Sequence, residues 1–89
     1  MSETVLITGS SRGIGKAIAL QLAQSGFDIV VHCRSRVEEA EEVAQAVREL
    51  GQRARVLQFD VSHRAEVAEK LLADVEENGA YYGVVLKTF

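Results

Sequence analysis

The sequence predicts an α/β fold, a doubly wound parallel sheet of four strands with three helices. Short apolar runs alternate with longer segments whose apolar residues recur at helical spacing, and each helical segment is followed by a glycine. A glycine-rich turn also joins the first strand to the first helix. Strands and helices that alternate in this way form a parallel sheet with right-handed crossovers. The expected strand order is 3-2-1-4, with the first two helices on one face and the third on the other.

A strand, a helix and a second strand are predicted in the first third of the chain. Residues 5–8 and 27–32 are mainly apolar, which is typical of strands in a sheet that is covered on both faces. Between them, apolar residues keep helical spacing from Ile14 to Ser25-Gly26, where the glycine can end a helix. These elements form the first β-α-β unit.

A second helix is predicted between residues 35 and 51. Ser35 and Glu38 have the spacing of a capping box, and the apolar residues that follow lie on one helical face until Gly51. The early turns carry four acidic residues, Glu38, Glu39, Glu41 and Glu42. Carboxylates there complement the helix dipole, so we interpret them as a solvated face and not as a metal site.

The last third of the chain predicts a strand, a helix and a strand. Residues 55–59 alternate only weakly between apolar and polar, which favours an edge strand. Ser62 is the expected N-cap of the third helix, which ends at Asn78-Gly79. The fourth strand is expected over residues 82–86, which are apolar and β-branched at their centre.

Length and composition exclude several classes of protein. With 89 residues, of which 47% are hydrophobic and 26% charged, the chain has a globular composition and room for one domain. It has no apolar run long enough to span a membrane, no signal-peptide pattern and a lone Cys33, so we expect a cytoplasmic protein without disulfides. Its net charge of −3 gives no reason to expect nucleic acid or an acidic membrane as a partner.

The stretch Thr8-Gly9-Ser10-Ser11-Arg12-Gly13-Ile14-Gly15 has the features of a phosphate-binding turn. It leaves a strand and opens a helix, where free amides and the helix dipole attract an anion. Gly9 is expected to make the tight turn, Gly13 to let a pyrophosphate approach, and Gly15 to let the helix pack close to the sheet. Its place inside a β-α-β unit makes the pattern more specific than three glycines alone.

This turn resembles the TGxxxGxG cofactor motif of classical short-chain dehydrogenase/reductases, and Asp60-Val61 matches the place where that family keeps an acid near the adenine ring. The similarity runs from Val5 to about Leu86 and is greatest to the 3-oxoacyl-[acyl-carrier-protein] reductase type, an oxidoreductase of fatty acid biosynthesis. The resemblance implies that residues 1–89 are the N-terminal nucleotide-binding part of a Rossmann-type domain. With Gly15 from the glycine pattern, the implied cofactor contacts are Gly9, Ser11, Arg12, Gly13, Ile14, Asp60 and Val61.

The charge at the end of the second predicted strand favours NADP over NAD. An NAD site typically has an acid there to bind the ribose 2′-hydroxyl, whereas the 2′-phosphate of NADP needs a cation. The sequence at this place is His32-Cys33-Arg34-Ser35-Arg36, which contains no acid. Arg34 is available for a charge-assisted contact with the phosphate, and Arg12 can supply a second.

No catalytic residues are predicted. The resemblance implies a catalytic Ser and a Tyr-x-x-x-Lys pair beyond the part that matches, and Lys87-Thr88-Phe89 stands where an Asn-Ala-Gly turn would follow. Tyr82 and Lys87 would leave a strand on opposite faces, and Tyr81 would lie ~20 Å from Lys87 at about 3.3 Å per residue.

The two histidines are also unpromising as bases. We interpret His32 and His63 as surface or strand-end residues, because neither has a nucleophile at a recognisable spacing. Cys33 is interpreted as a partly buried residue at a strand end.

The favoured function is therefore a truncated binding module that takes up NADPH weakly and does not turn it over. Two alternatives stay open. The chain is an enzyme that another chain completes, or it is a structural half-fold that associates with itself. A free edge on the fourth strand and a sheet face served by one helix favour a homo-oligomer, a dimer or larger.

Overall fold

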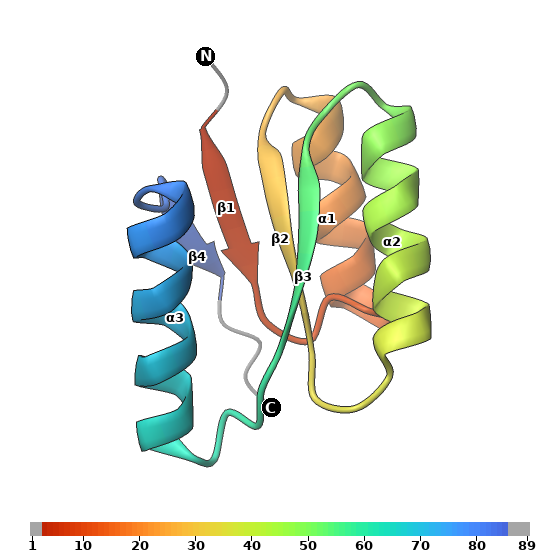
Figure 1. Ribbon diagram of the computed structural model, residues 1–89. Coiled ribbons are helices and arrows are strands. Elements are labelled where there is room, and N and C mark those ends of the chain that lie inside the picture. The colour runs from red at the N-terminus through yellow and green to blue at the C-terminus, as the bar shows by residue number, and fades with distance from the viewer. Residues whose placement is uncertain (1–2, 86–89) are drawn as a thin grey trace.

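The computed structural model describes residues 3–85, in which four strands alternate with three helices (Figure 1). The apolar runs of the sequence form the strands, and the segments with helical spacing form the helices. Their bounds are β1 (Thr4–Ile7), α1 (Gly13–Gln24), β2 (Asp28–Cys33), α2 (Val37–Glu49), β3 (Ala54–Gln58), α3 (Arg64–Asn78) and β4 (Gly83–Val85). Each predicted element is present, and Leu86, expected at the end of the fourth strand, lies outside the described residues.

The strands form one parallel sheet in the order β3-β2-β1-β4, as predicted. Helices α1 and α2 lie on one side of this sheet and α3 lies on the other (Figure 1). The weakly alternating β3 is at one edge, and its residues are half-buried or exposed. In the described part of the chain, β4 forms the other edge. The fold confirms a doubly wound arrangement in which the order of the strands reverses next to β1.

The two faces of the central strands have different neighbours. Side chains alternate across a strand, and one set, which includes Ile7 and Val31, is buried with the alanines and valines of α1 and α2. The other set includes Leu6 and His32, which line a cavity on the α3 side. Every residue of β2 is buried, because this strand has a neighbour on both edges and a helical layer against it.

The ends of the helices correct two predictions and confirm three. Neither predicted N-cap serine is a cap, because α2 begins after Arg36 and α3 after His63, and neither start has a side-chain capping bond. The hydroxyl and amide of Ser62 instead donate to the Asp60 carboxylate at 2.7 and 2.9 Å, a local turn that competes with capping. The three predicted helix ends are confirmed: Gly26, Gly51 and Gly79 all have a positive φ, of 100°, 94° and 94°.

A polar cluster connects α3 to the sheet. The Arg55 guanidinium on β3 donates to both carboxylate oxygens of Asp74 on α3, at 2.8 and 2.7 Å. Asn78 donates to the same carboxylate at 3.0 Å, and the Tyr81 hydroxyl donates to it from the segment that leads into β4. The Asp74 side chain is only 4% exposed. Three elements are thus joined through one buried carboxylate.

Candidate dinucleotide-binding site

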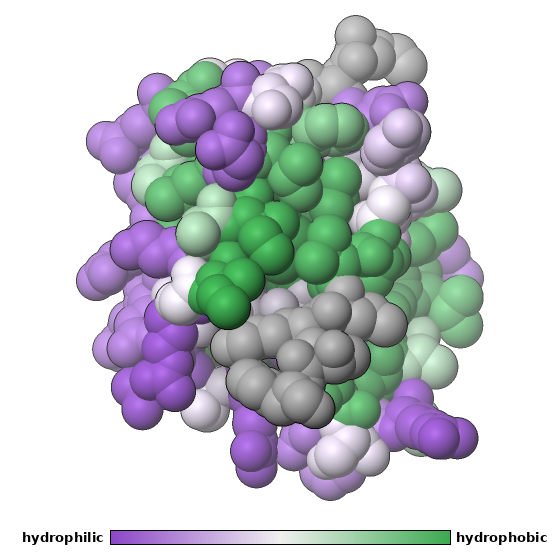
Figure 2. Space-filling model, turned by 180° about the vertical axis from the view of Figure 1, so that it is seen from behind, coloured by the Kyte–Doolittle hydropathy of each residue, from purple (hydrophilic) through white to green (hydrophobic). Residues whose placement is uncertain are grey.

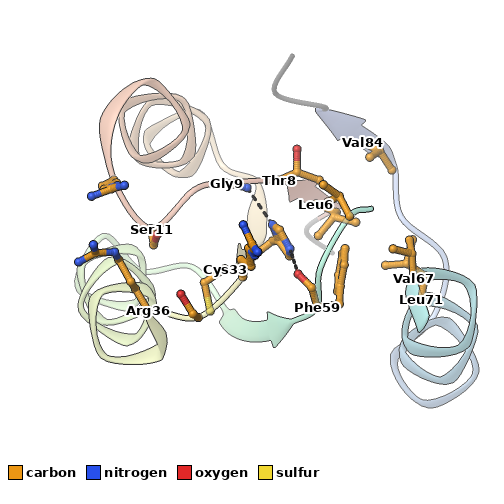
Figure 3. Close-up of a pocket in the computed structure, with 15 residues that line it drawn as sticks. Leu6, Thr8, Gly9, Ser11, Cys33, Arg36, Phe59, Val67, Leu71 and Val84 are labelled. Carbon is orange, nitrogen blue, oxygen red and sulfur yellow. Dashed lines mark hydrogen bonds between the residues drawn. The ribbon is translucent and has the colours of Figure 1, made fainter. Parts of the chain in front are cut away.

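A cavity of about 630 Å³ lies at the carboxyl ends of β1 and β2, beside the point where the strand order reverses. Ligands of open parallel sheets bind in this position. The glycine-rich turn forms one wall, and the loop after β2 forms another (Figure 3). Toward α3 the lining becomes apolar, with Leu6, Phe59, Val67, Leu71 and Val84.

The three glycines of the turn have separate structural roles. Gly9 and Gly13 have φ values of 63° and 62°, a region that glycine adopts without strain. A Cβ on Gly13 would meet no atom within 4 Å, so the backbone there is open to a ligand. A Cβ on Gly15 would lie 2.4 Å from the carbonyl oxygen of Gly9. We expected Gly15 to allow a close contact between the helix and the sheet. The close contact is instead between the helix and the backbone of the turn.

The start of α1 provides free amides. The first helical hydrogen bond runs from the Lys16 amide to the Arg12 carbonyl at 3.3 Å. The amides of Gly13, Ile14 and Gly15 come before it, so no helical carbonyl accepts from them. The first turn of α1 contains no acidic residue. These amides and the positive end of the helix dipole form an anion-binding position beside the open backbone of Gly13.

His32 holds the base of the turn, a role that our sequence interpretation missed. We expected a surface or strand-end residue, but His32 is 4% exposed inside β2. Its Nδ1 accepts a hydrogen bond from the Gly9 amide at 2.8 Å, and its Nε2 lies 2.8 Å from the Phe59 carbonyl oxygen. The signal in the sequence was a histidine within a run of otherwise apolar strand residues, where an unpartnered polar group would be costly.

Arginines line the cavity beyond β2. Arg12, Arg34 and Arg36 come from the turn and from the loop that follows the strand. The Arg34 side chain is 78% exposed and its Nε lies 3.4 Å from the Asp60 carboxylate. Hydrogen bonds from Ser62 lower the pKa of Asp60, and the positive charge of Arg34 adds to the effect. Because an exposed ion pair of this kind is weak, the guanidinium remains available to a phosphate.

The structure brings the predicted contact residues to one place. Gly9, Ser11, Arg12, Arg34 and Val61 line the cavity. Asp60 lies next to Arg34, and the other three predicted contacts, Gly13, Ile14 and Gly15, form the first turn of α1. Ile14 is 71% exposed, and its backbone amide is one of the amides at the start of α1 that no helical carbonyl accepts from.

Tyr81 and His63 do not line the cavity, whereas Cys33 does, at the end of β2. The Tyr81 hydroxyl is bound to Asp74, and burial together with this hydrogen bond raises the pKa of Tyr81 far above its usual range, so it is a poor acid. His63 is exposed and lies 3.6 Å from Glu66. Cys33, expected to be partly buried, is 1% exposed, and burial raises the pKa of its thiol. Lys87 lies outside the described residues.

Metal-binding clusters and membrane-spanning helices are both absent from residues 3–85. No group of three or more histidine, cysteine, aspartate or glutamate residues in that range could hold a metal ion. The acidic residues of α2 are mostly solvated, as expected, and Glu39 and Glu41 pair with Arg36 and Arg48. No helix in the same range is both long and apolar enough to cross a membrane.

The strand order, with a glycine turn at the point where that order reverses, defines the class of protein as one with an α/β dehydrogenase fold. The family model of the short chain dehydrogenases matches residues 3–84. The chain therefore belongs to the short-chain dehydrogenase family of oxidoreductases.

Two relatives place the chain within that family. The 3-oxoacyl-[acyl-carrier-protein] reductase FabG of Aggregatibacter actinomycetemcomitans is 85% identical over 86 residues, which are 97% of this chain and 36% of that protein. The reductase of the same name from Staphylococcus epidermidis is 35% identical over 80 residues, which are 90% of this chain and 33% of that protein. The chain spans about a third of the length of these relatives and resembles their N-terminal part.

Solved structures with the same fold belong to dehydrogenases. An acetoin dehydrogenase from Enterobacter cloacae has a TM-score of 0.91 at 30% identity, over 100% of this chain and 35% of that one. A putative dehydrogenase from Burkholderia cenocepacia, solved with bound NADP, has a TM-score of 0.87 at 30% identity, over 96% of this chain and 33% of that one.

Proposed function

We propose that residues 1–89 are the N-terminal, NADP(H)-binding portion of a reductase of the 3-oxoacyl-[acyl-carrier-protein] type. The observation that carries this proposal is the cavity at the strand-order reversal, which is lined by the glycine turn that leads into the free amides of α1 and by arginines of the turn and of the loop after β2. The 85% identity to a reductase of that name supports the enzyme type. The NADP bound in a structural neighbour supports the class of cofactor.

The turn fits the pyrophosphate. A Cβ on Gly13 would meet no atom within 4 Å, so the backbone there is open to a phosphate, and the amides of Gly13, Ile14 and Gly15 can donate to it. Gly9 and Ser11 line the same wall of the cavity. The adenine side would be formed by Asp60 and Val61, which follow β3 at the other wall.

The arginines favour NADP. Arg34 follows directly on β2, where an NAD-specific site would typically have an acid for the ribose 2′-hydroxyl. A guanidinium binds phosphate with paired, charge-assisted hydrogen bonds. Arg12 lines the same cavity and can supply a second contact. Asp60 is the nearest carboxylate to Arg34, and the ion pair between them would exchange in part for the phosphate.

The nicotinamide of a bound NADPH supplies hydride chemistry, and this chain supplies binding and orientation. In the family that it resembles, a Tyr-x-x-x-Lys pair serves as general acid with its supporting cation. The sequence has two tyrosines, Tyr81 and Tyr82, and the residues four positions after them are valine and leucine instead of lysine. These 89 residues therefore contain no such pair. We propose no catalytic residue here, and we expect binding without turnover.

Calorimetric titration with NADPH tests the proposal, run beside a reductase assay with a 3-oxoacyl thioester. We expect binding that saturates. The assay is expected to show no oxidation of NADPH above background. Absence of binding at millimolar NADPH would refute the binding function, and measurable turnover would refute the view that catalysis lies outside these residues.

Replacing Arg34 by aspartate tests the preference for NADP. We expect the affinity for NADPH to fall at least tenfold, because a favourable contact with the 2′-phosphate becomes repulsive, while the affinity for NADH changes less. Lys70→Asp is the matched control. It makes the same change of charge on an exposed residue of α3 that does not line the cavity. An equal loss for both cofactors would remove the assignment of Arg34.

Self-association is the second part of the proposal. Hydrophobic residues gather across the middle of the face seen in Figure 2. A shallow hollow on α1 is lined by Ile14, Ala17, Ile18, Gln21 and Leu22, and on β4 the side chain of Val84 is 48% exposed. Apolar surface of this kind and an edge strand both favour a partner. We propose a homo-oligomer in the cytoplasm, formed through the edge of β4 or through the sheet face that α3 alone covers.

Analytical ultracentrifugation tests this association. We expect the sedimenting mass of the 89-residue chain to rise to that of a dimer or larger as its concentration is increased. Val84→Lys places a charge on the edge strand and should shift the equilibrium toward the monomer, whereas Lys70→Asp should leave it unchanged. A strictly monomeric mass in concentrated solution would contradict the proposal.

A further inference from the structure

His32 connects the glycine turn to the end of β3 through both of its ring nitrogens. The Gly9 amide donates to Nδ1 at 2.8 Å, and Nε2 lies 2.8 Å from the Phe59 carbonyl oxygen (Figure 3). A backbone amide can only donate a hydrogen bond, and a carbonyl can only accept one. The two partners therefore select the neutral imidazole that carries its proton on Nε2.

The position of this ring is fixed from several directions. The imidazole packs on the Phe59 ring with 4.1 Å between centroids. The backbone of His32 also pairs with Ser10, whose hydroxyl accepts from the His32 amide at 3.0 Å and whose amide donates to the His32 carbonyl at 3.1 Å. One residue of β2 thus binds the amides of Gly9 and Ser10, and the amides that follow are left for the anion.

We infer that His32 is a positioning residue for the dinucleotide site, and that protonation of its imidazole releases the Gly9 end of the turn and weakens cofactor binding. This inference rests on the proposed function. A second proton must enter at Nδ1, the atom that accepts from Gly9. Protonation therefore places an N–H on Nδ1 opposite the N–H of Gly9, and two donors cannot form a hydrogen bond. The turn then loses the bond that aligns its amides with the arginines across the cavity.

The surroundings oppose this protonation. Burial lowers the pKa of His32, and the hydrogen bond to Phe59 offsets only part of that effect. The residues that line the cavity from α3, β1 and β4 are apolar. The charged and titratable groups around the ring are Arg12 in the turn, Cys33 at the end of β2, Arg34 and Arg36 in the loop after it, and Asp60, which is paired with Arg34.

The direction of the pH effect follows from the lowered pKa. An unfolded chain or a released turn takes up a proton near pH 6.5, whereas the intact anchor resists it until a lower pH. The contribution of the anchor is therefore complete above about pH 6.5 and is lost as the pH falls from there through the lowered pKa of His32. One proton changes the binding constant by at most tenfold per pH unit.

NADPH titrations between pH 5 and pH 8.5 test the inference on the wild type, His32→Asn and His32→Leu. The Asn carboxamide oxygen can take the place of Nδ1 and accept from Gly9, but it does not titrate. We expect His32→Leu to bind at least tenfold more weakly than the wild type above about pH 6.5, and His32→Asn to restore binding there. The wild type should lose affinity below pH 6.5 more steeply than His32→Asn. The 2′-phosphate also titrates near pH 6, but its contribution is common to all variants.

His63→Asn is the matched control, since His63 is exposed, lies beside Glu66 and does not line the cavity, and the substitution should leave the wild-type profile unchanged. Parallel loss of affinity in the wild type and His32→Asn would overturn the inference while the binding function stands. If NADPH does not bind at pH 8, the proposed function is wrong. In that case the ¹⁵N chemical shifts of the His32 imidazole in the free chain test whether the ring has the tautomer and the lowered pKa that the anchor requires. A proton on Nδ1, or titration at pH 6.5 or above, would refute it.

Discussion

Gly15→Ala is expected to abolish measurable NADPH binding and to lower the free energy of unfolding by about 2–3 kcal/mol, near the top of the range for overpacking. A Cβ at this position would lie 2.4 Å from the Gly9 carbonyl oxygen and 2.9 Å from the Ser10 Cα. Both are backbone atoms, so neither can rotate away as a side chain would. The turn must move away from α1, and its displacement separates the Gly9 amide from His32.

Gly83→Ala is the matched control for this experiment. A Cβ on Gly83 would meet no atom within 4 Å, and Gly83 does not have a positive φ. The same chemical change should therefore leave NADPH binding intact and alter the free energy of unfolding by about 0.5 kcal/mol or less. Urea denaturation followed by circular dichroism measures stability, and calorimetry measures binding. Wild-type stability and affinity in Gly15→Ala would contradict the close packing of helix and turn.

Asp74→Asn is expected to lower the free energy of unfolding by about 2 kcal/mol, because hydrogen bonds to a charged group contribute roughly 1.5–3 kcal/mol. The substitution removes the charge that holds Arg55 and Tyr81, while the shape of the side chain is kept. The Arg55 side chain is 32% exposed, so water recovers part of its solvation and limits the loss. For a domain of this size the melting temperature should fall by about 10 °C.

Glu77→Gln makes the same chemical change on an exposed residue of α3 and should alter the free energy of unfolding by less than about 0.5 kcal/mol. A double-mutant cycle with Arg55→Gln then isolates the pair. If Asp74→Asn is no more destabilising than Glu77→Gln, the cluster does not hold α3 to the sheet.

The Asp74 carboxylate also predicts part of the loss of folding stability at acid pH. Burial alone raises the pKa of Asp74, but hydrogen bonds from Arg55, Tyr81 and Asn78 outweigh burial and bring the pKa below its usual value. The contribution of Asp74 is therefore complete above about pH 4, the ordinary range of an aspartate, and is lost as the pH falls through the lowered pKa. Asp74→Asn should flatten this limb of the stability profile.

The local pattern of the sequence was sufficient for the order of the elements and the topology of the sheet. Helical spacing, apolar runs and the terminal glycines are local signals, each of which spans only a few residues. Parallel strands with short connections then leave few topologies open. The edge position of β3 was also predicted, because its weak alternation reflects its incomplete covering. The two serine caps were predicted wrongly, since a cap depends on which nearby acceptor the hydroxyl reaches.

The sequence by itself determined the doubly wound fold, the glycine turn and the arginines at the end of β2. Only the tertiary structure decided how the turn is held. His32 and Gly9 are 23 residues apart, His32 and Phe59 are 27 apart, and Arg55 and Asp74 are 19 apart. No periodicity spans such separations, because these bonds form only when the sheet has brought distant segments together. The glycine turn is therefore local in its pattern, but its anchor depends on the assembled sheet.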